Sequence, residues 1–412
     1  MDKEKQMLLF LLSSTALRTL TDSFTFGILF VIALRYSGEA TAALVNSLGL
    51  LLIFLLSPFI GKIIDQKILS VRLSGIIYSF TGIGMFLFLT SIDFRIVIFV
   101  NLMLFVVFNI PASIYLASTS SKIYKGKPAS GYSLLASVNT LFYIIGTTIG
   151  AYLVQNNHEL IWVMLKFSLS IFVGIILALA FKILEYNLQK TETPAINPQA
   201  QILSTTGKVI VSPSFMNLRL FKEFFISRIK AMNKSLVTFV VCIAIFTFAR
   251  VFYLTTVAFQ IYDIFEGDVF MYTLLINTAA LTAFLVFPFG GKISDRFGSK
   301  NMFILALGLT PLYFLSFIVL SNKILLVILW SLPIGVFSEV SQIGIISHLT
   351  SEGERNSAIG LVTSATSLGS VLGSLALSYF VDKSNLHTLL YLQIFVPIIL
   401  IPILIFNPKL KN

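Results

Sequence analysis

The sequence predicts an all-α polytopic membrane protein with twelve transmembrane helices, arranged as two pseudo-symmetric halves of six. Hydrophobic residues make up 57% of the 412 residues and charged residues only 11%, whereas soluble domains carry about 25% charged residues. Apolar runs of about 20 residues, each long enough to cross a hydrocarbon layer of about 30 Å, take up most of the chain. A repeated segment then suggests that the runs belong to two related halves.

This segment is the stretch PFIGKIID at residues 58–65, which returns 230 positions later as PFGGKISD at residues 288–295. Six of the eight positions are identical, and each copy closes a long apolar run. Many secondary transporters are built from two such membrane repeats.

The predicted spans cover residues 7–34, 40–61, 71–91, 94–118, 129–154, 160–183, 235–260, 269–290, 301–321, 324–349, 356–381 and 387–407. An even number of spans after a basic start places both termini in the cytoplasm. Of the 29 Lys and Arg residues, only Arg35, Arg95, Lys323 and Lys383 fall in predicted outer loops, as the positive-inside rule requires. We therefore expect a multi-pass protein of a bacterial-type plasma membrane, with its first span retained.

One long connection separates an N-terminal half at residues 1–184 from a C-terminal half at 235–412. In the second part of this linker, residues 215–234 carry apolar side chains at spacings of three and four, with basic side chains on other faces. That pattern predicts a basic amphipathic helix on the anionic inner leaflet, and a solvated linker helix is the alternative. The net charge of +11 belongs to the cytoplasmic loops, so we expect no nucleic-acid partner.

The sequence lacks the residue patterns of a membrane-embedded enzyme. Its one cysteine, Cys242, lies in an apolar run, which argues against a disulfide framework or a thiolate metal site. No His-Glu-x-x-His motif, P-loop or pair of intramembrane aspartates occurs. We expect no catalytic residue, no metal and no cofactor.

The loop after the eighth predicted span carries a family motif. Residues 291–300, GKISDRFGSK, nearly complete the pattern Gly-x-x-x-Asp-Arg-x-Gly that ends in basic residues, and the copy after span two keeps Gly61 and Asp65 but has Gln66 in place of the arginine. With its twelve spans and its duplication, the chain resembles the major facilitator superfamily over its whole length. The resemblance implies the major facilitator fold and a monomeric secondary transporter that moves a small molecule by alternating access.

In that family the motif forms a conformational latch between the halves. Its aspartate faces a helix N-terminus, where unsatisfied N–H groups and the positive end of the helix dipole attract a carboxylate, and the contact holds the outward-open state. The resemblance places Asp65 at the start of span eleven, near 355–357, and Asp295 at the Pro-led start of span five, 128–130. It assigns the latch to Gly61, Asp65, Gly291, Asp295, Arg296 and Lys300. Because Gln66 replaces the arginine, we expect the latch of the first half to be the weaker.

Charged side chains inside the predicted spans are candidate functional groups, because an unpaired charge in a bilayer is costly. Arg18 and Asp22 lie one turn apart on span one and can pair. We predict that Asp22 binds the proton or a cationic substrate group, with Arg18 as its partner. A static ion pair that fixes the orientation of the helix is the alternative.

Arg250 in span seven is the counterpart of Arg18, and Glu339, midway along span ten, is the available carboxylate of the same half. Glu339 either pairs with Arg250 or carries a proton independently. Lys166 lies only a few residues into span six, and we expect it to reach the outer interface. Four polar side chains are candidates to line a cavity or to hold helices together: Asn46, Asn109, Asn139 and Asn277.

Two stretches resemble the drug, macrolide and siderophore exporter branch of the superfamily: Thr21-Asp22 in span one and residues 354–361 at the opening of span eleven. The branch implies proton-coupled efflux of an amphipathic or hydrophobic small molecule such as an antibiotic, and thereby antibiotic resistance. Span five departs from its antiporter motif, because residues 146–150, GTTIG, contain no proline. An importer or uniporter of a small nutrient therefore remains the alternative, and a sensor or an enzyme is not expected.

Overall fold

The computed structural model describes residues 3–23, 47, 49–61, 64, 110, 113–114, 117, 124, 127–156, 161, 164–166, 168–179, 234–266, 268–319, 323–380 and 386–407. Every regular element in these residues is a helix. Six helices in this part of the chain are long and apolar enough to cross a membrane.

The helices are α1 (Lys3–Ser23), α5 (Pro128–Gln155), α9 (Lys234–Ile264), α10 (Val269–Phe297), α11 (Ser299–Val319), α12 (Lys323–Trp330), α13 (Ile334–Leu349), η3 (Glu352–Glu354), α14 (Arg355–Phe380) and α15 (Leu386–Ile405). Shorter apolar helices cover Gly49–Gly61 and Met164–Leu179. The bounds of α5, α9, α11, α14 and α15 lie within a few residues of the predicted spans.

Two predicted spans in the C-terminal half differ from the helices of the structure, one in its end and one in its continuity. Helix α10 continues through the motif that we expected to form a loop and ends at Phe297, where Gly298 adopts a φ of 90° that favours glycine. Span ten, predicted as one helix, is broken into α12 and α13 at residues 331–333, because Pro333 cannot donate a helical hydrogen bond. Thr282 of α10 donates a hydrogen bond to the Ser331 carbonyl at the break.

Much of the N-terminal half lies outside the described residues. This applies to the predicted span at 71–91, to the end of span one beyond Ser23, and to all but single residues of span four at 94–118. The linker and its predicted amphipathic helix also lie outside them, apart from Lys234, which begins α9.

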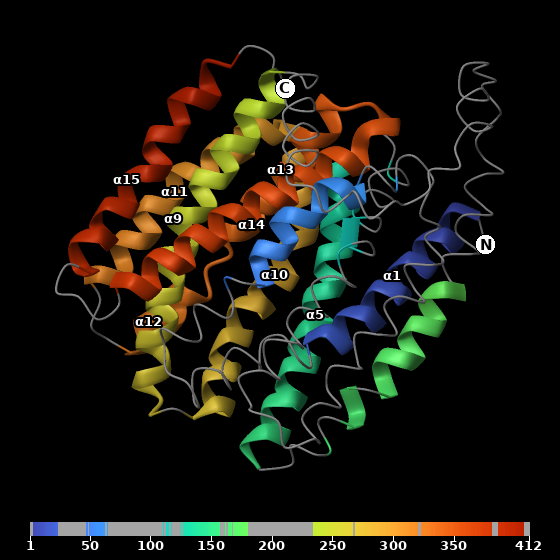
Figure 1. The fold of residues 1–412 in the computed structure, drawn as a ribbon, viewed down its shortest axis with the longest axis horizontal. Coiled ribbons are helices and arrows are strands. Elements are labelled where there is room, and N and C mark those ends of the chain that lie inside the picture. The colour runs from blue at the N-terminus through green and yellow to red at the C-terminus, as the bar shows by residue number, and fades with distance from the viewer. Residues whose placement is uncertain are drawn as a thin grey trace, which may run out of the picture.

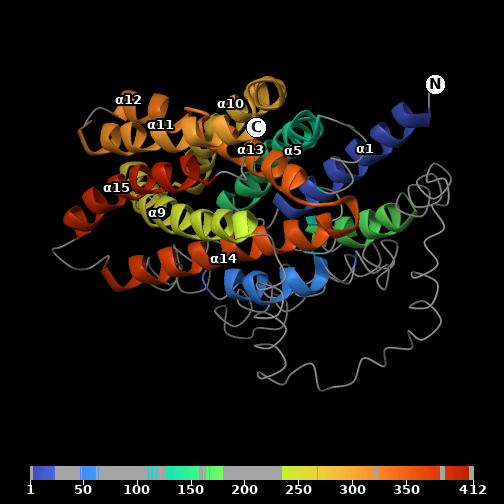
Figure 2. The ribbon, with the colours of Figure 1, turned by 90° about the horizontal axis from the view of Figure 1, so that it is seen from above.

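Helices α5 and α10 run antiparallel along the boundary between the halves (Figure 1). In Figures 1 and 2, α1, α5 and the helix Met164–Leu179 lie on one side, and α9, α11, α12 and α15 on the other. Three hydrogen bonds between the halves follow the interface along its length: Ser130–Asp295, Ser137–Phe284 and Thr147–Asn277.

The helix Gly49–Gly61 packs against α14, as α10 packs against α5. The Ser364 hydroxyl donates a 2.7 Å hydrogen bond to the Phe54 carbonyl. A Cβ atom at Gly360 would lie 2.4 Å from the carbonyl oxygen of Ser57, so the two backbones approach more closely than larger residues allow. Among the described residues, these two helix pairs at the interface each join the second helix of one half to the fifth of the other.

Candidate functional site

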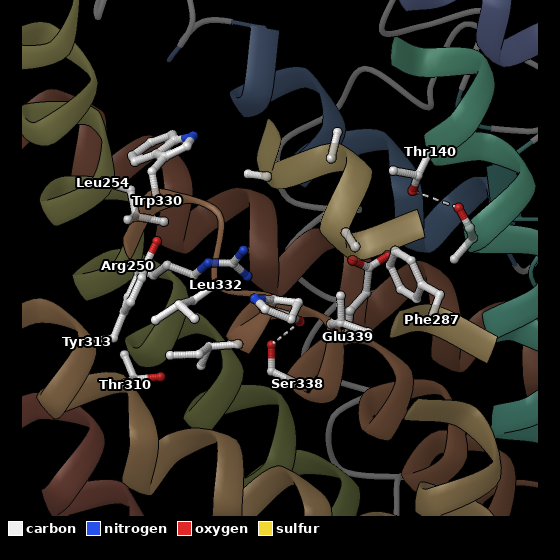
Figure 3. Close-up of a pocket in the computed structure, with 18 of the residues that line it drawn as sticks. Thr140, Arg250, Leu254, Phe287, Thr310, Tyr313, Trp330, Leu332, Ser338 and Glu339 are labelled. Atoms are coloured by element: carbon white, nitrogen blue, oxygen red, sulfur yellow. Dashed lines mark hydrogen bonds between the residues drawn. The ribbon is translucent and has the colours of Figure 1, made fainter. Parts of the chain in front are cut away.

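A cavity of about 550 Å³ lies between α5 of the N-terminal half and helices α9 to α13 of the C-terminal half (Figure 3). Apolar and aromatic side chains form most of its described wall, and the break between α12 and α13 contributes Leu332 and Pro333. Irregular backbone at membrane depth is tolerated where it lines a cavity. Arg250 and Glu339 are the charged side chains among the described lining residues.

Arg250 is held on one wall by the packing of α9. Three residues further along, Tyr253 stacks on Phe314 of α11 with ring centroids 4.0 Å apart, and its hydroxyl donates to the Phe314 carbonyl. A Cβ atom at Gly335 would lie 2.7 Å from Nη2 of Arg250. The guanidinium therefore occupies space that Gly335 leaves open at the start of α13.

Glu339 makes a contact that joins the two halves. The hydroxyl of Tyr132 on α5 donates a 2.6 Å hydrogen bond to Oε1 of Glu339 on α13. Of the two roles left open for Glu339, an ion pair with Arg250 is not formed, since no such pair occurs between these two described residues. A role as a proton carrier stays a prediction.

A separate group of charges joins α1 to the helix Met164–Leu179. Asp22 is 7% exposed; its Oδ2 lies 3.6 Å from Nε of Arg18, and its Oδ1 lies 3.9 Å from Nζ of Lys166. The Lys166 ammonium also donates a 2.7 Å hydrogen bond to the Thr21 carbonyl. Our prediction for Lys166 was wrong: it is 1% exposed and turns toward the Asp22 carboxylate of α1, which it shares with Arg18.

The asparagines divide between the two roles proposed for them. Asn139 lines the cavity, and its Oδ1 accepts a 2.9 Å hydrogen bond from Thr19 of α1. Asn277 is buried between α5 and α10, where it accepts from Thr147 at 3.0 Å and donates to Thr148 at 2.8 Å. It therefore holds helices together and does not line this cavity. Asn46 and Asn109 lie outside the described residues.

Asp295 caps α5 of the opposite half, the helix start at which the family resemblance places it. Its Oδ1 accepts from the Ala129 N–H at 3.2 Å, and its Oδ2 accepts from the Ser130 N–H at 2.9 Å and from the Ser130 hydroxyl. The N-cap residue of α5, Lys127, makes no capping hydrogen bond of its own, and Pro128 follows it. The C-terminal half thus supplies the carboxylate that this helix N-terminus requires.

The two motif glycines occupy matching places in the structure. A Cβ atom at Gly291 would lie 2.1 Å from the Ser133 hydroxyl oxygen on α5, and one at Gly61 would lie 2.4 Å from the Asn356 carbonyl oxygen on α14. Each glycine therefore lets its helix touch the start of the fifth helix of the other half. Asp65, whose predicted partner is that region of α14, lies outside the described residues.

Arg296 and Lys300 make their described contacts within the C-terminal half. The Arg296 guanidinium lies 5.9 Å from the centroid of the Phe297 ring. The Lys300 ammonium donates a 3.4 Å hydrogen bond to the Ile405 carbonyl at the end of α15, where a cation is favourable. Among the described residues, the inter-half contact of this motif is made by Gly291 and Asp295.

Two residues that the site uses, Tyr132 and Gly335, were not predicted from the sequence. Tyr132 was not singled out, although a tyrosine in an apolar span needs a partner for its hydroxyl. Gly335 lies beside Pro333 and was treated as part of a continuous helix. Their partners, Glu339 and Arg250, come from elsewhere in the chain, so no local pattern identified either contact.

Comparison with known proteins agrees with this architecture. The family model described as Major Facilitator Superfamily matches residues 11–337 and 239–412. No curated protein matches the chain at a significant level of sequence similarity.

Solved structures with a similar fold include the human organic anion transporter MFSD10 (TETRAN), with 14% identity, a TM-score of 0.62 and coverage of 98% of this chain and 100% of that one. They also include a bacterial homologue of the iron transporter ferroportin, in an outward-facing state with soaked iron, with 15% identity, a TM-score of 0.63 and coverage of 98% and 99%. At these identities the likeness shows the fold alone. From the family match over nearly the whole sequence, the chain belongs to the major facilitator superfamily, whose members are transporters.

Proposed function

We propose that this protein is a secondary active transporter that works by alternating access and exports an amphipathic or hydrophobic small molecule in exchange for protons. The observation that carries the proposal is the cavity bounded by α5 of one half and α9 to α13 of the other. A site at the interface of two halves is the place where rocking of one half against the other exposes a substrate to each side in turn.

The contacts of Asp295 and Gly291 support a conformation in which the two halves are closed together at one end. They join α5 and α10 at the end of the interface that carries the motif. We assign this end to the cytoplasmic side from the distribution of Lys and Arg, with both termini on that side of a bacterial-type plasma membrane. The described conformation is then closed toward the cytoplasm, and opening to that side breaks the cap on α5.

Two carboxylates support proton coupling in different ways. Asp22 is buried against Arg18 and Lys166, so its protonation changes the charge balance of a group that joins two helices. Glu339 faces the cavity and bonds to Tyr132 across the halves. We propose Asp22 as the coupling carboxylate and Glu339 as the second candidate.

Transport by proteoliposomes tests this proposal. We expect the wild-type protein to move lipophilic dyes when a pH gradient is imposed and to stop when an ionophore collapses the gradient. Asp22→Asn should abolish gradient-driven transport while the protein remains monodisperse. Asp268→Asn, which alters an aspartate that caps α10 within its own half, serves as the control and should transport normally.

The outcomes separate the parts of the proposal. Normal transport by Asp22→Asn would make Glu339 the coupling carboxylate, to be tested with Glu339→Gln. Transport that ignores the gradient would contradict proton coupling. Absence of transport across a broad panel of dyes and metabolites would contradict the exporter assignment.

An importer or uniporter of a small nutrient is the second candidate. It is favoured by the segment at 146–150, which has no proline and whose Thr147 and Thr148 bond to Asn277 of the other half. The same proteoliposomes distinguish the candidates, because a uniporter equilibrates its substrate without a pH gradient.

A further inference from the structure

The cavity contains a cation, Arg250, that forms no ion pair with the described residues. No ion pair or hydrogen bond involving Arg250 occurs among the described residues, although its side chain lines the cavity. The other lining charge, Glu339, already accepts a hydrogen bond from Tyr132. A guanidinium at membrane depth is costly without a counter-charge, so an anionic group that enters the cavity would be a favourable partner for Arg250.

The position of Arg250 suits an oxyacid group. Packing of Tyr253 on Phe314 holds α9 in place, and the absence of a side chain at Gly335 accommodates the guanidinium against the start of α13. Figure 3 shows the Arg250 side chain reaching into the cavity between the Trp330 and Glu339 walls. The planar guanidinium offers two parallel N–H donors, which match a carboxylate or sulfonate.

The wall around Arg250 is aromatic and apolar. Tyr313, Phe314 and Trp330 line the cavity from α11 and α12, and Leu254 lies one turn beyond Arg250 on α9. Trp330 is the last residue of α12, directly before the helix break. Aromatic side chains of this kind bury the apolar body of a ligand while a single polar group fixes its orientation.

We propose that this cavity binds an amphipathic organic anion, with its acidic group on Arg250 and its apolar body against Tyr313, Phe314 and Trp330. The proposal rests on the proposed transport function and specifies the substrate class of the same cavity.

Tryptophan fluorescence gives a direct binding assay, because Trp330 lines the cavity and the chain has only two tryptophans. In a Trp162→Phe background, Trp330 is the only fluorescent tryptophan. The probes are the carboxylate 4-(4-nitrophenyl)butanoate, its primary amide and the primary amine 4-(4-nitrophenyl)butylamine. They share a nitrophenyl group that quenches the fluorescence, and they differ in charge. We expect saturable quenching with an apparent affinity for the carboxylate at least about tenfold tighter than for the amide, since charge-assisted hydrogen bonds provide such a difference.

Two substitutions at Arg250 and one control define the site. Arg250→Gln should remove the preference for the carboxylate over the amide. Arg250→Lys should keep a severalfold preference, because a lysine keeps the charge but not the two parallel donors. Lys234→Gln removes an exposed cation from the first residue of the same helix and should leave the preference for the carboxylate unchanged. Arg250→Lys also serves if the glutamine variant does not fold.

Glu339→Gln adds a test of the sign of the charge that binds. Removing a carboxylate from the cavity should leave the affinity for the anionic probe unchanged or raise it. A tighter affinity for the amine or the amide than for the carboxylate, a carboxylate preference that survives Arg250→Gln, or no quenching by any probe would overturn the anion site. Gradient-driven transport of dyes in the same protein would still support the transporter, so the two proposals fail separately.

Discussion

At the residue scale, the arrangement of Arg18, Asp22 and Lys166 shows how the protein keeps charges inside the membrane. Two basic groups from different helices lie within 4 Å of one carboxylate at distances of 3.6 and 3.9 Å. Lys166 is almost fully buried, so it depends on Asp22 and on the Thr21 carbonyl. Removing the carboxylate leaves both cations with less compensation.

This dependence predicts the stability of single and double variants. Asp22→Asn should lower the free energy of unfolding by about 1–3 kcal/mol, the range for a buried polar group that loses its partner. Adding Lys166→Met should recover part of the loss, because it removes the cation left without a carboxylate. Thermal unfolding in detergent ranks the stabilities of the wild-type protein, Asp22→Asn and the double variant.

The control is Lys234→Met, which removes an exposed lysine. Added to Asp22→Asn, it should recover nothing. A double variant Asp22→Asn, Lys166→Met that is less stable than Asp22→Asn alone would show that Lys166 is held mainly by contacts other than the carboxylate.

At the scale of elements, two helix N-termini use an aspartate in different ways. Asp268 caps α10 from within, accepting from the Phe270 and Met271 N–H groups at 2.9 and 3.0 Å. Asp295 caps α5 from the opposite half. The local chemistry is the same, but only the second cap links the two halves.

Alanine substitutions at these two positions should therefore have different effects. Each removes a capping carboxylate, at a cost of about 1 kcal/mol in stability. Asp295→Ala should also increase the distance between spin labels at positions 9 and 234, exposed sites on α1 and α9, measured in a Cys242→Ala background. Asp268→Ala should leave this distance unchanged.

The distance measurement can contradict the latch. If Asp295→Ala and Asp268→Ala give the same label distances as the parent protein, the Asp295 cap contributes to helix stability alone. The close approaches of Gly61 and Gly291 would then be sufficient to keep the halves together.

At the scale of the whole molecule, two helix pairs hold the halves together. Helices α5 and α10 contact each other from Ser130–Asp295 to Tyr152–Phe270, whose ring centroids are 6.2 Å apart. The helix Gly49–Gly61 packs closely on α14. These contacts do not involve the linker at 185–234.

We therefore expect the linker to be dispensable for association. Residues 1–184 and 235–412, expressed as two chains in the same cells, should co-purify through a tag on either one. Asp295→Ala in the second chain should reduce the yield of the complex, and Asp268→Ala should reduce it less. Failure of the unsubstituted halves to co-purify would show that covalent connection is required.

The sequence alone determined the membrane class and the approximate helices of the C-terminal half, and the family resemblance of the motif placed Asp295 at the start of α5. Hydropathy and helix ends depend on residues that are close together in the chain, whereas the repeated motif identified the aspartate and the family that it resembles supplied the opposite helix. The break at Pro333 was harder to predict from the sequence, because a proline in a membrane helix is tolerated when side chains such as Thr282 satisfy the freed backbone groups.

Only the tertiary structure decided the partners of Lys166, Glu339 and Asn277. Each side chain had several reachable partners along the chain, and the packing of α1, α5 and α10 selected Asp22, Tyr132 and Thr147. The cavity around Arg250 likewise depends on the placement of six helices. A sequence pattern records which groups need partners, whereas the distances that select those partners arise from packing across the chain.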